Sequence, residues 1–188
     1  MDALLIALIA CLASEIGDRS QLLAAALFKR FDRRALVIAG LVVAVAANTA
    51  ASSYAGHLVG SMLSHDARTL FMALGFLAGG FGMVMPTKKP DMLQGWRIGA
   101  FATSALGLLI LGFGESAQFL IMGISAARGD ALLAAAGGVI GILVACVSAM
   151  VAPEICAATR ALRIYRRIMA AIFVLTGGTM AVGALGLT

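Results

Sequence analysis

The sequence predicts an all-α integral membrane protein, with six transmembrane helices arranged as two inverted three-helix repeats. Three observations lead to this prediction. Apolar residues make up 62% of the 188 residues and charged residues only 12%, whereas soluble domains are nearer half apolar and a quarter charged. Six apolar segments are long enough to cross a bilayer, which takes roughly 20 residues. Features of the first half recur about 100 residues later in the second.

The six segments are separated by short polar or charged breaks. A soluble protein with a mean hydropathy of +1.02 would expose apolar patches that cause aggregation, so we place all six segments in the bilayer. The third break contains Pro86 and Pro90, which end a helix. The first segment has acidic residues midway and no basic N-terminal region, unlike a cleavable signal peptide. The predicted spans cover approximately residues 3–28, 35–63, 69–85, 98–126, 131–152 and 168–187.

The basic residues predict the orientation of these spans. Eleven of the 14 Lys and Arg residues lie in the connections after the first, third and fifth spans. Positively charged connections stay in the cytoplasm, so we expect a multi-pass protein of a bacterial-type inner (plasma) membrane with both termini outside. Topology then explains the net charge of +5. A nucleic-acid partner is not expected, because it would need one continuous basic patch.

The chain repeats itself weakly. Residues 15–18 (Glu-Ile-Gly-Asp) resemble residues 115–118 (Glu-Ser-Ala-Gln), and the glycine pair at 79–80 recurs at 177–178. Three helices in each half would give the halves opposite orientations, as in many secondary transporters. We therefore expect one three-helix repeat over residues 1–90 and another over residues 91–188. The alternative is chance recurrence of glycine pairs in an apolar sequence.

Three acidic residues lie inside the predicted spans: Glu15, Asp18 and Glu115. A charge at the centre of a spanning helix costs about 2.5–3.5 kcal/mol on insertion scales, so such residues are usually functional. Their spacing places Glu15 and Asp18 on one face of the first helix. Arg19 can offset part of their charge, and an ion pair that only holds helices together is the structural alternative. Two acids for one arginine, with Glu115 far from any basic residue in sequence, favour a cation site instead.

Oxygen atoms dominate the polar side chains on these helices. Ser20 and Gln21 follow the first acids, and Asn48 on the second span could supply a carbonyl oxygen or only a hydrogen bond between helices. Oxygen ligands suit Ca²⁺, Mn²⁺ or Mg²⁺ better than zinc or copper. A carboxyl group that holds either a proton or a cation is what a proton-coupled cation carrier requires.

Residues 15–21 (Glu-Ile-Gly-Asp-Arg-Ser-Gln) resemble the signature Glu-x-Gly-Asp-(Lys/Arg)-(Ser/Thr) of the Gdt-type calcium/manganese transporters, the relatives of transmembrane protein 165. The resemblance covers essentially the whole chain. It implies six or seven spans in two inverted halves, each with one motif, and a proton-driven Mn²⁺ or Ca²⁺ exchanger that uses Glu15 and Asp18 as ligands and proton acceptors. In the second motif, Gln118 stands where the family has Asp. It can donate a carbonyl oxygen but cannot carry a proton, which leaves three carboxylates instead of four.

We therefore expect a secondary transporter that exports a divalent cation, Mn²⁺ before Ca²⁺, from the cytoplasm in exchange for protons. The alternative is a small-solute or amino-acid exporter in which Arg19 holds the substrate. An enzyme is not expected, because the sequence shows no Ser/His pair, no HExxH motif and no aspartates with protease spacing. No cofactor is expected besides the transported ion, and assembly into a homo-oligomer is left open. The predicted metal ligands are Glu15, Asp18, Glu115 and Gln118, and the supporting residues are Arg19, Ser20, Gln21, Asn48 and Ser116.

Overall fold

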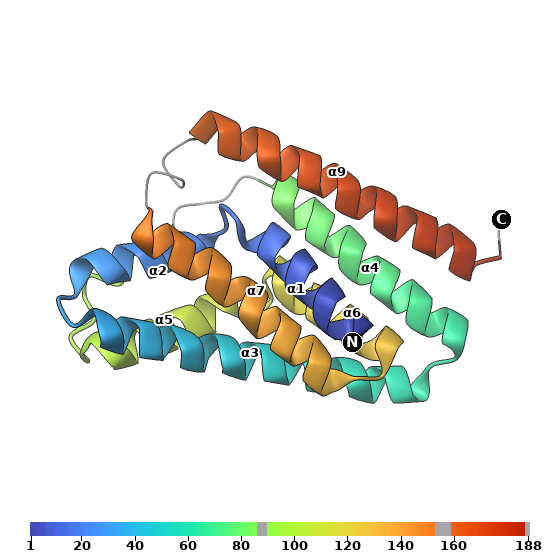
Figure 1. The fold of residues 1–188 in the computed structure, drawn as a ribbon, viewed down its shortest axis with the longest axis horizontal. Helices are drawn as coiled ribbons and strands as arrows, with labels where there is room; N and C mark the ends of the chain where they lie inside the picture. The colour runs from blue at the N-terminus through green and yellow to red at the C-terminus, as the bar shows by residue number, and fades with distance from the viewer. Residues whose placement is uncertain (86–89, 153–158, 187–188) are drawn as a thin grey trace.

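The fold is a bundle of helices (Figure 1), seen in a computed structural model that describes residues 1–85, 90–152 and 159–186. All regular secondary structure in these residues is helical, which confirms the predicted class. The described helices are α1 (Asp2–Glu15), α2 (Arg19–Arg30), α3 (Arg34–Met62), α4 (His65–Val84), α5 (Ala100–Gly112), α6 (Ser116–Arg128), α7 (Ala131–Val151) and α9 (Thr159–Ala184).

Four of the described helices are long and apolar enough to cross a membrane: α3, α4, α7 and α9. The pair α5 and α6 forms a fifth candidate, bent by 67° at its break. The chain is therefore a multi-pass membrane protein. The first and fourth predicted spans are each divided into two helices, because residues 16–18 separate α1 from α2 and residues 113–115 separate α5 from α6.

The last helix begins earlier than its charges suggest. We expected a basic connector that ends before residue 168, but α9 already begins at Thr159. Its first turns are amphipathic, because Arg163 and Arg167 are exposed whereas Leu162 and Tyr165 are partly buried. The arginines therefore continue the helix on its exposed face. The end predicted for the third span agrees with the end of α4 at Val84, and Pro86 after it lies outside the described residues.

The two ends of the bundle collect different segments (Figure 1). The beginning of α1, the end of α9, the α3–α4 turn and the α6–α7 turn lie at one end, which we call the terminal end. The α2–α3 turn, the beginning of α5 and the beginning of α9 lie at the other, the basic end, which is named for residues 29–34 and the arginines that open α9.

Helix α6 lies at the centre of the bundle. It packs against α1, α3, α4 and α7, and its Leu120, Ile121 and Ile124 are fully buried. Large apolar side chains on the outer helices are exposed instead, among them Ile9, Val43, Ile110 and Leu175. An apolar exterior around a packed centre is what a bilayer environment requires.

Glycines bring two pairs of helices into matching contact. A Cβ on Gly40 of α3 would lie 2.8 Å from the carbonyl oxygen of Phe101 on α5. In the second half, a Cβ on Gly137 of α7 would overlap the carbonyl oxygen of Leu4 on α1. Each residue of the second contact has a counterpart 97 positions away in the first (40 to 137, and 4 to 101). The α1–α7 contact thus repeats the α3–α5 contact.

The same offset relates the two sides of the contact between α4 and α9. A Cβ on Gly80 would lie 2.8 Å from Cγ2 of Val174, and a Cβ on Gly177 would lie 2.9 Å from Cγ of Leu77. Positions 80 and 177, and 77 and 174, are again 97 apart. The packing therefore repeats with an offset of 97 residues, close to but different from the 98 and 100 that the sequence suggested.

Candidate metal site

The two helix breaks have the same backbone conformation. The first residue of the break has φ −61° and ψ 115° in residues 16–18, and φ −68° and ψ 116° in residues 113–115. The glycines that follow, Gly17 and Gly114, have φ of +79° and +81°. The third residue is an acid that caps the next helix, with φ −87° and ψ 171° in one break and φ −71° and ψ 163° in the other. Only glycine adopts such positive φ values without strain.

This geometry corrects the predicted alignment of the two motifs. Glu115 occupies the place of Asp18, the acid at the start of a helix, because both follow the glycine of their break. The position that corresponds to Glu15 is then Gly112. The predicted match of Glu15 with Glu115 is therefore wrong by three residues. The predicted alignment matched the two glutamates by their side chains. The backbone conformation instead matches Gly17 with Gly114.

The breaks bring the three predicted acids together. Glu15, Asp18 and Glu115 each offer one carboxylate oxygen, and these oxygens all lie within 4.8 Å of one another. Glu15 is only 2% exposed. Oε1 of Glu115 is buried and has no hydrogen-bond partner among the described residues. A buried polar atom without a partner is unusual and can mark the place of an ion, so these residues could hold a cation.

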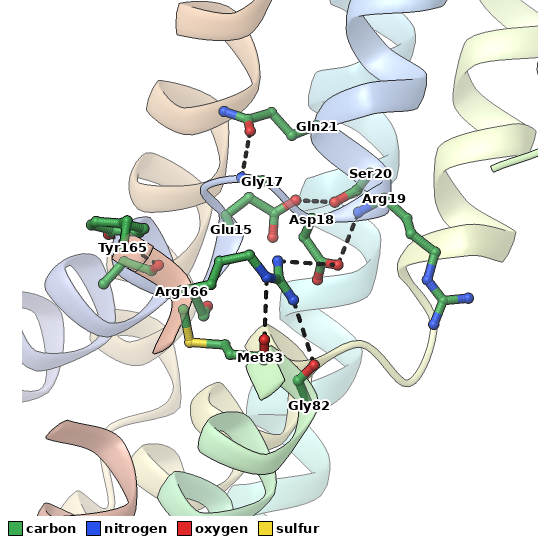
Figure 2. A network of polar contacts seen from close by, with 12 residues as sticks. Glu15, Gly17, Asp18, Arg19, Ser20, Gln21, Gly82, Met83, Tyr165 and Arg166 are labelled. Carbon is green, nitrogen blue, oxygen red and sulfur yellow. Dashed lines mark hydrogen bonds and ion pairs between the residues drawn. The ribbon is translucent and has the colours of Figure 1, made fainter. Parts of the chain in front are cut away.

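Neighbouring donors hold Glu15 and the first break in place. The hydroxyl of Ser20 donates to Oε1 of Glu15, and the thiol of Cys146 on α7 lies 3.9 Å from the same oxygen. Gln21 is not directed at the acids. Its Oε1 accepts from the backbone N–H of Gly17 at 2.7 Å (Figure 2), and its Nε2 donates to the carbonyl of Ala145 at 2.8 Å. Gln21 thus ties the break to α7.

The amides of the predicted ligand Gln118 and of the predicted supporting residue Asn48 lie beside the acids but are hydrogen-bonded to other groups. Oε1 of Gln118 accepts from the hydroxyl of Ser52 at 2.6 Å, and Nδ2 of Asn48 donates to the carbonyl of Leu109 at 3.1 Å. Both amides line a cavity of about 20 Å³ together with Glu15 and Glu115. Asn48 also takes up the space beside Gly112, where a Cβ would lie 2.8 Å from Nδ2 of Asn48. Asn48 thus lies where the second half lacks a counterpart of Glu15.

The arginine that pairs with the acids is not the one predicted. Arg19 is exposed, and its guanidinium extends away from Glu15 and Asp18 (Figure 2). Instead, Nη1 of Arg166 on α9 lies 3.9 Å from Oδ1 of Asp18. Sequence reasoning missed Arg166 because it treated residues 160–167 as a connector. Its helical spacing from the buried residues Ala170 and Phe173 is the signal that could have found it.

Two neighbouring cavities share Arg19, and the first of them reaches Asp18 and Glu115. One of about 270 Å³ is lined by Asp18, Glu115, Ser116 and Arg19. A second of about 390 Å³ shares Arg19 with it and continues between α2, α5 and the residues around Trp96. Ser116 thus lines the approach to the acids. The second cavity is also lined by Leu93, whose carbonyl accepts from Arg30 at the end of α2, so its lining extends toward the basic end.

The opposite side of the acids is tightly packed. A Cβ on Gly56 of α3 would overlap the carbonyl oxygen of Met122 on α6, and the hydroxyl of Ser125 donates to the carbonyl of Ser53 at 2.6 Å. We call this contact, with Gly60 against Ala126, the α3–α6 seam. It closes the bundle between the acids and the terminal end.

Substitution of Gly17 by Ala is expected to lower the free energy of unfolding by about 1–3 kcal/mol. A backbone with a φ of +79° is strained in any residue that has a Cβ, and the new methyl would lie 2.8 Å from the side chain of Leu162 on α9. Gly95 is the matched control, because it has no positive φ and nothing within 4 Å of a Cβ. Thermal unfolding in detergent tests this. Equal shifts for Gly17→Ala and Gly95→Ala would contradict the role assigned to the break.

Comparison with known proteins gives two matches. Residues 3–91 match the family model described as divalent cation/proton antiporter GDT1. The chain is 27% identical to a Vibrio cholerae serotype O1 protein named "Putative manganese exporter". The alignment spans 176 residues, which are 93% of this chain and 88% of that protein. No solved structure matches. The resemblance read from residues 15–21 is thereby confirmed, and it is to a transporter family. The ligand roles of individual residues stay predictions.

Proposed function

Because residues 3–91 match the GDT1 family of divalent cation/proton antiporters, we propose that this chain exchanges a divalent cation for protons across a lipid bilayer. The convergence of Glu15, Asp18 and Glu115 within 4.8 Å carries the proposal. Three carboxylates in so small a buried volume repel one another unless a cation or protons neutralise them. A site that either a cation or protons can occupy, but not both at once, couples the two fluxes.

Mn²⁺ is the proposed cargo, with Ca²⁺ second. The relative in Vibrio cholerae has manganese in its name, and carboxylate oxygens suit both ions. Glu15, Asp18 and Glu115 are the proposed ligands. Gln118 is a further proposed ligand, but its carbonyl oxygen would have to exchange the hydroxyl of Ser52 for the ion.

We propose six spans in two inverted halves, residues 1–90 and 91–188. In this arrangement α1 with α2, and α5 with α6, are broken spans. The 14 residues of α1 extend about 21 Å, so the breaks lie deep in a hydrocarbon core of about 30 Å. The repeated contacts at Gly40 and Gly137 support this arrangement. Broken helices near the midplane bind the ions of several secondary transporters.

We propose that the basic end faces the cytoplasm of a bacterial-type inner membrane, with both termini outside. The cavities that approach the acids from the basic end would then admit a cytoplasmic cation. Opening of the α3–α6 seam, with closure of the cavity at Arg19 and Ser116, would expose the ion to the outside. Protons that arrive from outside would release it, so the net movement is export.

Ion-driven proton movement in inverted membrane vesicles tests the proposed function. The cytoplasmic face is outward in such vesicles, and an acid interior is established before the ion is added. Addition of Mn²⁺ is expected to release protons from the interior, which a pH-sensitive dye reports, and vesicles without the protein provide the control. If neither Mn²⁺ nor Ca²⁺ moves protons beyond the control, the proposal is wrong.

Export of a small carboxylate-bearing solute is the second candidate function. Arg19 lines both cavities on the approach to the acids, where its guanidinium could bind a substrate carboxylate. Thermal stabilisation of the purified protein separates the two functions. Mn²⁺ is expected to raise the unfolding temperature and amino acids to leave it unchanged, and the reverse result would favour the solute exporter.

A further inference from the structure

The positive charge that pairs with the acid cluster belongs to Arg166 of α9, a helix that takes part in neither break. We propose that Arg166 is a fixed counter-charge that makes the three acids selective for divalent rather than trivalent cations. The inference deepens the proposed function and rests on it, because it assigns a specificity-determining role within the same site. It starts from the contacts of one guanidinium group (Figure 2).

Arg166 is held by backbone atoms rather than by the acids. Its Nε donates to the carbonyl of Met83 at 3.3 Å and its Nη2 to the carbonyl of Gly82 at 3.5 Å. These carbonyls belong to the last turn of α4, where the helix dipole favours a positive charge. The side chain is 9% exposed, so the guanidinium has a defined position that does not depend on Asp18.

The third nitrogen of the group is directed at the acids without bonding to them. Nη1 lies 3.9 Å from Oδ1 of Asp18, which is too long for a hydrogen bond. It is buried and has no hydrogen-bond partner among the described residues. The positive charge therefore acts on the cluster through space. It occupies no oxygen of Asp18, whose Oδ1 accepts from the backbone N–H of Arg19 at 2.9 Å.

The charges then add up to the valence of the cargo. Glu15, Asp18 and Glu115 contribute −3 when ionised, and Arg166 brings the total to −2, which a divalent cation neutralises. Arg19 was expected to supply this charge, but its guanidinium extends away from Glu15 and Asp18 (Figure 2) and its side chain is exposed, so solvent and salt screen its charge. Without Arg166 the site would carry −3, which favours a trivalent ion.

A purely structural role for Arg166 makes a different prediction. If Arg166 only joins α9 to α4, its loss lowers stability and weakens the binding of every ion by a similar factor. If it is a counter-charge, its loss removes the repulsion between the guanidinium and the bound cation, which is stronger for a trivalent than for a divalent ion. The ratio of the two affinities therefore separates the roles, whereas stability alone does not.

The experiment measures dissociation constants of Mn²⁺ and Tb³⁺ by calorimetry, on the full chain in detergent at one pH and ionic strength. In Arg166→Gln, the affinity for Tb³⁺ relative to Mn²⁺ is expected to rise at least about tenfold, from the Coulomb energy of one charge at this range. Arg166→Lys keeps the charge and Arg163→Gln removes an exposed one on the same helix. In both variants the affinity for Tb³⁺ relative to Mn²⁺ is expected to stay within about twofold of that of the unchanged protein.

A second comparison keeps the test decisive if Arg166→Gln alone does not fold. The double variant Asp18→Asn with Arg166→Gln removes both partners and leaves no unpaired arginine. Relative to Asp18→Asn alone, its preference for Tb³⁺ is expected to rise by a similar factor. An unchanged ratio in folded variants overturns the inference while the proposed function stands. Failure of the unchanged protein to bind either ion overturns the proposed function itself.

Discussion

Replacement of Glu15 by Gln is expected to weaken Mn²⁺ binding at least about 100-fold and to abolish ion-driven proton movement. Glu15 is the most buried of the three acids, at 2% exposure, and it accepts from Ser20 and Cys146. Glutamine has nearly the same shape but carries neither the charge that attracts the cation nor a titratable proton. The packing around the side chain is retained, so the expected loss is one of charge.

The measurement combines calorimetry of Mn²⁺ binding with the vesicle assay. Asp66→Asn is the matched control, because it removes one exposed carboxylate from the first turn of α4, far along the chain from the cluster. This control is expected to bind and transport like the unchanged protein. Full Mn²⁺ affinity in folded Glu15→Gln would show that the ion binds elsewhere.

Substitution of Gly56 by Ala is expected to slow transport at least about tenfold while Mn²⁺ affinity in detergent changes less than about threefold. The new methyl would overlap the carbonyl oxygen of Met122, a backbone atom that cannot rotate away, so α3 and α6 must separate at the seam. Overpacking of this kind costs about 1–3 kcal/mol. The closed state of the terminal end is then disfavoured, but the acids are unchanged.

Gly178→Ala is the control for the seam. Gly178 is also a helical glycine, but nothing lies within 4 Å of a Cβ at that position. Transport by this variant is expected to equal that of the unchanged protein. Unimpaired transport by a folded Gly56→Ala, or parallel losses of binding and transport, would contradict the assignment of the seam as the moving closure.

The membrane class and the three acids could be predicted from the sequence because both depend on composition within long segments. A carboxyl group in an apolar segment is conspicuous wherever the segment folds, so Glu15, Asp18 and Glu115 were found without knowledge of the bundle. Their convergence within 4.8 Å depends on two helix breaks. The glycine of the first break, Gly17, lies in the recognised motif, whereas the second break has no comparable signal.

The register between the halves was mispredicted for a physical reason. Side-chain identity suggested that Glu15 matches Glu115, but the repeat is a property of the backbone, in which Gly17 and Gly114 share a positive φ. At the position that matches Glu15, the chain has Gly112 and fills the space with Asn48. The backbone of the two breaks matches while the side chains at the site do not, so an alignment based on side chains is displaced.

Arg166 was missed because charge alone was used to place the end of a membrane segment. An arginine within a basic run is normally at the surface, but a helix turns by 100° per residue and presents each arginine to a different environment. Arg163 and Arg167 are exposed, whereas Arg166 faces α4 and the acids. The contacts of α9 with α4, which no local pattern specifies, decide which arginine is buried.

Glu15, Asp18 and Glu115 are proposed to bind one divalent cation together. Anomalous scattering from crystals grown with Mn²⁺ would locate that ion. One anomalous peak is expected between α1, α2 and α6, within about 2.6 Å of a carboxylate oxygen from each of the three acids. Mn²⁺ peaks found only away from these oxygens, in crystals of protein that transports the ion, would contradict it.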